Sequence, residues 1–221
     1  MDSEKFKVHC NSIGLNLSDD QTTHFANFEE ALYLANERTN LTRVSREDCL
    51  TRHFMDSLLL AEFIPLRSKV LDIGTGPGFP AWPLACARPD IEVTALDSNG
   101  KMVNFLKTQP LKNLHPVLGR AELPVERESF DFVTGRAVAT LEIQLEMSAA
   151  YCEIEGVVVP MRTPRDTIEG KKSEKLGLDL VEVATRNLPG TDILRTFPIY
   201  RKMRRTPSQF PRSWAEIKNS K

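Results

Sequence analysis

Short apolar runs alternate with amphipathic segments along most of the chain from residue 69 onward. The apolar runs predict strands at residues 69–73, 91–96, 115–118, 130–135 and 153–160. The segments between them have the spacing of helices, at about residues 80–87, 99–108 and 139–150. Because strands and helices alternate at this spacing, we expect an α/β fold with a parallel sheet covered by helices on both faces.

Two later apolar stretches, at residues 178–187 and 193–203, predict a pair of antiparallel strands. They extend the expected sheet to seven mostly parallel strands. The interval 163–177 before them is polar and contains Pro164 and Gly170, so we expect a mobile loop there.

Helical patterns also precede the first predicted strand. Residues 21–38 and about 45–63 both show helical spacing of apolar positions, and polar residues suited to helix caps come before each. We therefore divide the chain into an N-terminal helical extension, residues 1–65, and an α/β domain, residues 66–221, that ends in a basic strand and tail.

Composition mainly excludes functions. The chain has 221 residues, of which 41% are hydrophobic and 27% charged, as is usual for globular proteins. Its N-terminus lacks the apolar core of a signal peptide, and no apolar run approaches the roughly 20 residues that span a bilayer. The four cysteines form no C-x-x-C pair, so neither a metal site nor a disulfide framework is indicated. We expect a cytoplasmic protein, with no membrane partner.

Charge is distributed unevenly along the chain. The net charge is −1, but from Arg195 to the end there are eight Lys or Arg residues against one acid, a local charge of +7 that leaves −8 for the rest. Such a tail can place phosphates at one edge of the molecule. We predict that Arg201, Lys202, Arg204 and Arg205 contact RNA; the alternative is a solvated surface strand with a loose terminus.

The first strand ends in the sequence D-x-G-x-G-x-G, formed by Asp72, Gly74, Gly76 and Gly78, with Phe79 following. This differs from the dinucleotide fingerprint G-x-G-x-x-G. Glycines allow a tight turn and close approach of a ligand to the backbone. An acid at this strand end suits a cationic ligand and repels a pyrophosphate. The turn therefore favours S-adenosylmethionine over NAD.

Polar residues follow the next strands at corresponding positions. Asp97 ends the second strand, where a carboxylate can accept both ribose hydroxyls, and Glu122 and the Ala121 backbone follow the third, where adenine would lie. Ligands of parallel sheets bind beyond the carboxyl ends of the strands. These positions therefore predict one cofactor site along that edge.

Candidates for catalysis are few. Arg136 ends the fourth strand, and its planar fork suits the cofactor carboxylate or a phosphate, although it could instead pair with an acid such as Asp131 or Glu142. His53 and Asp56 are three residues apart and share a helix face, which allows an acid–base pair. A packing or orienting role for these two residues is the interpretation we favour.

Several segments together resemble one known family, the glucose-inhibited division protein B family of bacterial small-subunit ribosomal RNA guanine-N7 methyltransferases. The resemblance covers about residues 15–160 and rests on Asn40-Leu41-Thr42, Arg52-His53-Phe54-Met55-Asp56-Ser57-Leu58, Asp72 to Pro80, Leu96-Asp97-Ser98, Arg120-Ala121-Glu122 and Arg136-Ala137-Val138-Ala139. It implies a Rossmann-like S-adenosylmethionine-dependent methyltransferase fold. It also implies that Gly74, Phe79, Ala121, Glu122 and Arg136 contact the cofactor.

The chain departs from this family at Ala81, Met102, Arg162 and Thr163, and again at Ser213-Trp214. The cofactor half of the pattern is intact, whereas the half expected to face RNA is altered. Methylation of a small molecule or of another RNA, or a non-catalytic cofactor-binding role, therefore stay open as alternatives.

The resemblance implies ribosomal RNA or the assembled small subunit as partner, and we expect a monomer. Guanine N7 carries a free lone pair at neutral pH, so its methylation needs no general base, in agreement with the lack of an obvious base among the strand-end residues. N7 lies in the narrow major groove of A-form RNA. The target base is thus expected in a single strand, or flipped out of a helix.

Overall fold

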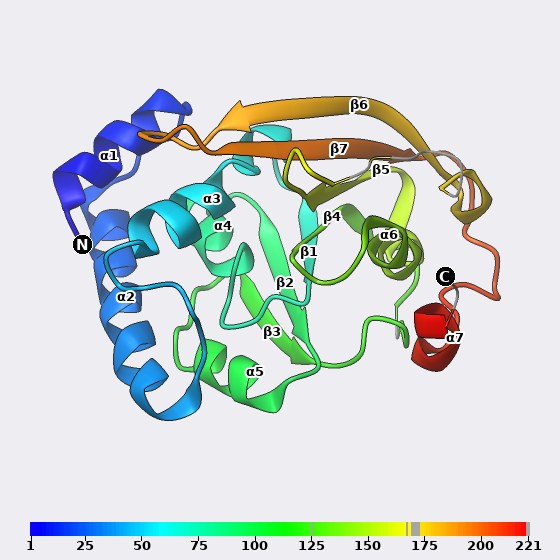
Figure 1. The fold of residues 1–221 in the computed structure, drawn as a ribbon, viewed down its shortest axis with the longest axis horizontal. Helices are drawn as coiled ribbons and strands as arrows, with labels where there is room; N and C mark the ends of the chain where they lie inside the picture. The colour runs from blue at the N-terminus through cyan, green and yellow to red at the C-terminus, as the bar shows by residue number, and fades with distance from the viewer. Residues whose placement is uncertain (125, 167, 169–172, 220–221) are drawn as a thin grey trace.

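The computed structural model describes residues 1–124, 126–166, 168 and 173–219. Its centre is a seven-stranded sheet with the order β3-β2-β1-β4-β5-β7-β6 (Figure 1). Neighbours from β3 to β5 pair in parallel, whereas β7 pairs antiparallel with both β5 and β6. This is the mostly parallel α/β sheet predicted from the sequence.

The strands lie within two residues of their predicted bounds. They are β1 (Lys69–Ile73), β2 (Glu92–Asp97), β3 (Leu114–Leu118), β4 (Phe130–Arg136), β5 (Cys152–Met161), β6 (Leu178–Asn187) and β7 (Leu194–Lys202). The predicted crossover helices are α4 (Ala81–Ala87), α5 (Gly100–Lys107) and α6 (Leu141–Ala149).

Alternate residues of the central strands enter two separate cores. Val70 and Phe132 belong to a core on one face of the sheet, and their neighbours Leu71 and Val133 belong to a core on the other. The strands are therefore apolar on both faces, which is why they appear in the sequence as unbroken apolar runs.

The N-terminal region packs on the first of these faces. It comprises α1 (Ser3–Ser12), α2 (Asp19–Thr39), the π-helix η1 (Leu50–Met55), α3 (Asp56–Leu58) and the 3₁₀ turn η2 (Ala61–Phe63). Phe28 of α2 stacks on Trp82 of α4, with ring centroids 4.1 Å apart. The aromatic cluster thus crosses the boundary predicted at residue 65, and the extension shares a core with the sheet.

Three parts of the helical prediction need correction. The expected regular helix over residues 45–63 is a π-helix followed by short helical turns, and α1 and the C-terminal helix α7 (Trp214–Asn219) were not anticipated. Figure 1 shows α1 and α7 toward opposite ends of the longest axis.

Part of the loop predicted over 163–177 lies outside the described residues. Its described ends form a turn, in which the Thr163 N–H donates to Asp166, and the 3₁₀ turn η3 (Glu174–Leu176). Within the described part of the chain, no helix combines the length and apolarity needed to cross a membrane.

Candidate active site

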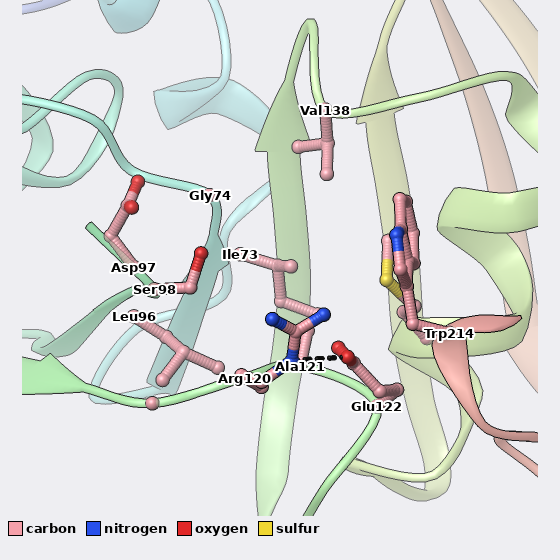
Figure 2. A pocket seen from close by; sticks show the side chains of 12 residues that line it. Ile73, Gly74, Leu96, Asp97, Ser98, Arg120, Ala121, Glu122, Val138 and Trp214 are labelled. Atoms are coloured by element: carbon pink, nitrogen blue, oxygen red, sulfur yellow. Dashed lines mark hydrogen bonds and ion pairs between the residues drawn. The ribbon is translucent and has the colours of Figure 1, made fainter.

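A cavity of about 310 Å³ opens beyond the carboxyl ends of β1, β2 and β3. Its walls come from the glycine turn, the acidic end of β2, the loop after β3 and two more distant segments (Figure 2). The lining residues are Ile73, Gly74, Leu96, Asp97, Ser98, Gly119, Arg120, Ala121, Glu122, Val138, Met147 and Trp214.

The turn after β1 uses glycines where other residues would be strained. Gly74, Gly76 and Gly78 have φ values of +68°, +58° and +118°. A Cβ at Gly78 would lie 2.7 Å from Cδ1 of Leu106, whereas one at Gly76 would meet no atom within 4 Å. Gly78 thus permits close packing below the turn. Gly76 leaves open space beside it for a ligand.

Two carboxylates, Asp97 and Glu122, line this first cavity and supply hydrogen-bond acceptors. Asp97 Oδ2 accepts the Gly76 N–H at 2.8 Å, and Oδ1 accepts the Asn99 N–H at 2.8 Å. Because a carboxylate oxygen can accept two hydrogen bonds, each Asp97 oxygen can accept a further one from a ligand. Glu122, in the loop after β3, is held by Arg120. These carboxylate acceptors fit ribose hydroxyls and the adenine amino group, which donate.

Other predicted cofactor residues lie below the cavity and are absent from its lining. Asp72 is fully buried, and its Oδ2 accepts the Ala81 N–H at 3.1 Å, which joins β1 to the start of α4. Burial raises the pKa of Asp72 to about 7. Phe79 is also buried and stacks face to face on the ring of His53, with centroids 4.0 Å apart. These two residues support the turn from beneath.

A second cavity, of about 480 Å³, lies beside the first at the ends of β4 and β5. Val138 lines the first cavity, whereas Arg136 and Ala137 line the second, so the segment after β4 stands between them. The second cavity is lined by Val44, Arg52, His53, Asp56, Arg136, Ala137, Met161, Arg162, Thr163, Asp166 and Arg195. Four arginines face two acids here.

A buried carboxylate organises two of these arginines. Asp56, just after the π-helix, pairs with Arg136 of β4 at 3.1 Å and with Arg195 of β7 at 2.6 Å. Arg136 also donates to the Arg52 carbonyl at 2.9 Å and lies 5.4 Å from the Phe79 ring centroid. Arg136 thus faces the second cavity. Its ion pair is with Asp56, and neither of the acids weighed from the sequence supplies it.

His53 is held neutral between two fixed partners. Its Nδ1 accepts from Arg136 Nη2 at 3.1 Å, because a guanidinium only donates, and Nε2–H therefore donates to Thr42 Oγ1 at 2.7 Å. Burial, together with the charges of Arg136 and Arg52, lowers the pKa of His53 to about 3. With its lone pair engaged, His53 orients Arg136 and is not a free base. This geometry fits the orienting role favoured from the sequence.

Arg162 is a buried cation on the wall of the second cavity. It is 7% exposed; Nη1 donates to the Ala139 carbonyl at 2.8 Å and Nη2 to Gln144 Oε1 at 2.6 Å. Its Nε is buried without a hydrogen-bond partner. Among the described residues no carboxylate lies within ion-pair distance of Arg162.

The basic residues predicted to meet RNA differ in exposure. Arg201, Arg204 and Arg205 are exposed and lie near single acids, such as Glu155 beside Arg201 at 3.0 Å. Lys202 is fully buried, where it donates to the Ala149 carbonyl and to Thr206 Oγ1. Lys202 is therefore a structural residue, and its predicted contact with RNA does not fit its position.

Sequence reasoning missed Arg195 and Trp214 as lining residues, and it treated Arg162 only as a departure from a pattern. The sequence indicates Arg195 only as the start of a basic tail, because its partner Asp56 is 139 positions away. Nothing local to these residues indicates which cavity they line.

Comparison with known proteins identifies the family. The family model described as rRNA small subunit methyltransferase G (GidB) matches residues 21–188. The chain belongs to this family. The match confirms the resemblance drawn from the glycine turn and its accompanying motifs.

Curated relatives within the GidB family match nearly the whole chain. Ribosomal RNA small subunit methyltransferase G of Lactobacillus delbrueckii subsp. bulgaricus is 36% identical, with 96% of each chain covered. The protein of the same name from Clostridium perfringens is 34% identical, with 96% of this chain and 95% of that chain covered.

Solved structures confirm the methyltransferase fold of this GidB member. A methyltransferase in complex with the Haloferax volcanii Trm112 activator superposes with a TM-score of 0.59 at 16% identity, covering 80% of this chain and 98% of that one. M. jannaschii TYW2 in complex with AdoMet gives a TM-score of 0.54 at 17% identity, covering 67% and 75%. At these identities the likeness concerns the fold alone.

Proposed function

We propose that this protein transfers a methyl group from S-adenosylmethionine to N7 of a guanine in small-subunit ribosomal RNA. The observation that carries the proposal is a pair of neighbouring cavities at the carboxyl edge of one sheet. One offers the acceptors that a nucleoside requires, and the other offers arginines. Membership of the GidB family and the names of its curated relatives give the substrate class.

The first cavity is the proposed cofactor site. Asp97 would accept hydrogen bonds from the ribose hydroxyls, and Ala121 and Glu122 would contact the adenine. Gly74 lies beside Val138, which follows Arg136 and Ala137 of the second cavity. When bound, S-adenosylmethionine supplies a methyl group on a positively charged sulfur. No carboxylate needs to leave its present partners to make these contacts.

The second cavity is the proposed place of the target nucleotide. Its arginines can donate to guanine O6 or to flanking phosphates. Arg162 supports this placement because its buried guanidinium lines the cavity and its Nε has no hydrogen-bond partner. Arg136 is fixed by Asp56 and His53, so it can orient a base without a change of conformation.

The reaction proposed here requires positioning and the exclusion of water. Guanine N7 attacks with its own lone pair, so the site needs no group to take up a proton. Holding the reacting groups in line is worth roughly 7–11 kcal/mol. His53 agrees with this scheme, since it is neutral and its lone pair already accepts from Arg136.

Both proposed sites are built from one chain, which is why we propose that a monomer suffices, working in the cytoplasm on ribosomal RNA. Exposed Arg201, Arg204 and Arg205 are the proposed phosphate contacts outside the cavities; Lys202 is left out because it is buried.

Labelled methyl transfer tests the function directly. S-adenosylmethionine with a tritiated methyl group is incubated with small subunits, or with the naked ribosomal RNA, that lack the modification. We expect label in the RNA, and chain scission at a guanine after reduction and aniline treatment. We also expect a single-turnover rate that is nearly flat between about pH 6 and 8. Label on ribose, on an exocyclic amine or only on a small metabolite would overturn the proposal.

A further inference from the structure

The chain after β7 returns to the cofactor cavity. This C-terminal segment, residues 203–219, crosses from the end of β7 to α6 and ends in α7. Trp214, the first residue of α7, lines the first cavity together with Asp97 and Glu122. Figure 2 draws the Trp214 indole and Asp97 on opposite sides of the cavity.

Several contacts fix the C-terminal segment on α6. The Arg212 guanidinium makes a two-pronged ion pair with Glu146, through Nε at 2.9 Å and Nη2 at 2.6 Å, and the Arg212 N–H donates to the same carboxylate at 2.9 Å. Thr206 Oγ1 donates to the Ala149 carbonyl at the end of α6. Ile217, one turn beyond Trp214, is 1% exposed.

The same helix supplies the cavity wall beside Trp214. Met147 of α6 lines the cavity, and its neighbour Glu146 holds Arg212 two residues before Trp214. Two-pronged pairing of a guanidinium with a carboxylate fixes orientation as well as distance. The position of the indole is therefore fixed through α6, because this helix packs on the sheet through Leu141, Leu145 and Ala149.

Trp214 differs from the rest of the apolar wall. Ile73, Leu96 and Met147 are at most 6% exposed and Ala121 and Val138 are half-buried, whereas Trp214 is 38% exposed. A wide aromatic face thus lies open beside a cavity whose acceptors are Asp97 and Glu122. Aromatic side chains bind the π-face of a nucleobase by stacking, while oxygen acceptors bind ribose hydroxyls and base edges.

We propose that Trp214 stacks on the adenine of the cofactor, so that the C-terminal segment is a part of the cofactor site. The inference rests on the proposed binding of S-adenosylmethionine in the first cavity. It assigns a role to one of the positions at which the chain departs from its family's pattern. On this proposal the end of the C-terminal segment does not bind RNA, because Arg212 is already paired with Glu146 and Trp214 contacts the cofactor.

Substitution at Trp214 gives the first test. Calorimetric titration with S-adenosylhomocysteine and with adenosine should show affinity weakened about 5-fold to 150-fold by Trp214→Ala, the range for removal of one base–aromatic stack. Trp214→Phe should retain most of the affinity. The matched control is Lys218→Ala on the exposed side of α7, which should bind like the wild type. Equal weakening in Trp214→Ala and Trp214→Phe, or no weakening in either, would overturn the proposal.

Intrinsic fluorescence gives a second test that does not depend on activity. The chain has two tryptophans, and Trp82 is buried with its Nε1–H donating to the Gln109 carbonyl, so its emission should stay constant. Saturation with adenosine should quench wild-type emission and leave Trp214→Phe unchanged. Glu146→Gln should reduce both the quenching and the affinity, because it loosens the Arg212 anchor. Quenching that persists in Trp214→Phe would overturn the proposal.

The two proposals fail in different ways. If wild-type protein methylates ribosomal RNA but Trp214→Ala binds adenosine normally, only the stacking inference is refuted. If wild-type protein binds neither S-adenosylhomocysteine nor adenosine, the proposed cofactor site fails, and the stacking inference with it.

Discussion

Replacing Asp56 by Ala removes the carboxylate that joins three distant parts of the chain. Asp56 pairs with Arg136 of β4 and Arg195 of β7, and its side chain is 5% exposed. The substitution leaves two guanidinium groups without their counter-charge at the edge of the second cavity. We expect a decrease in both stability and methyl transfer.

The magnitude follows from burial. Removing one partner of a buried ion pair costs about 3–5 kcal/mol, but Arg136 and Arg195 are each close to one-fifth exposed and keep part of their hydration. We therefore expect the free energy of unfolding to fall by roughly 2–4 kcal/mol. The matched control is Asp48→Ala. Asp48 pairs with Arg52 at 4.0 Å with both side chains more than half exposed, so its removal should cost less than about 1 kcal/mol.

Urea unfolding followed by circular dichroism measures both variants, with calorimetric binding of S-adenosylhomocysteine alongside. Because Asp56 lines only the second cavity, cofactor affinity should stay near wild type while the rate of methyl transfer falls. Equal stability of the two variants would refute the structural role of the Asp56 pair. A decrease in cofactor affinity as large as the decrease in rate would return Arg136 to the cofactor site, as the sequence predicted.

Further predictions concern the cofactor acid, the buried acid and the basic strand. Asp97→Ala should weaken S-adenosylmethionine binding by roughly 1.5–3 kcal/mol, and an unchanged dissociation constant in calorimetry would show that the site lies elsewhere. Because the pKa of Asp72 is raised from 3.8 to about 7, its contribution to stability is present below pH 4 and disappears as pH rises through 7. Asp72→Asn should therefore gain about 2–3 kcal/mol relative to wild type between pH 5 and pH 8 in urea unfolding, and parallel pH profiles would contradict this. Joint neutralisation of Arg201, Arg204 and Arg205 should flatten the slope of log RNA affinity against log salt by roughly 0.7 for each single-strand phosphate that is no longer neutralised. An unaltered slope would assign phosphate binding to other residues.

The sheet could be predicted because its strands are apolar on both faces and each is bounded by turn residues. Val70-Leu71 and Phe132-Val133 are apolar at consecutive positions for this reason. The glycine turn was equally predictable, since Gly74, Gly76 and Gly78 adopt backbone conformations that few other residues tolerate.

The N-terminal region was less predictable because tertiary packing overrides local preference there. Residues 50–55 have the composition of an ordinary helix, yet they form a π-helix whose wider turn places His53 against Phe79 and Asp56 between two arginines. Helix α1 has few apolar residues, and Phe6 and Cys10 are the ones it buries. Sequence patterns record neither the partner rings nor the partner charges.

Some residues of the second cavity could be identified from the sequence, but the partners and directions of their side chains could not. The sequence assigns Arg136 to the cofactor because its planar fork suits the cofactor carboxylate and the family resemblance places it there. Its direction is instead fixed by Asp56 and His53, which lie at least 80 positions away. Local charge alone assigns Lys202 to RNA, yet its burial depends on Ala149 and Thr206. A charged residue's role here is set by the carboxylate or carbonyl it meets across the fold. The roles of the cationic residues are thus the hardest to predict from the sequence, because their partners come from other elements of the chain.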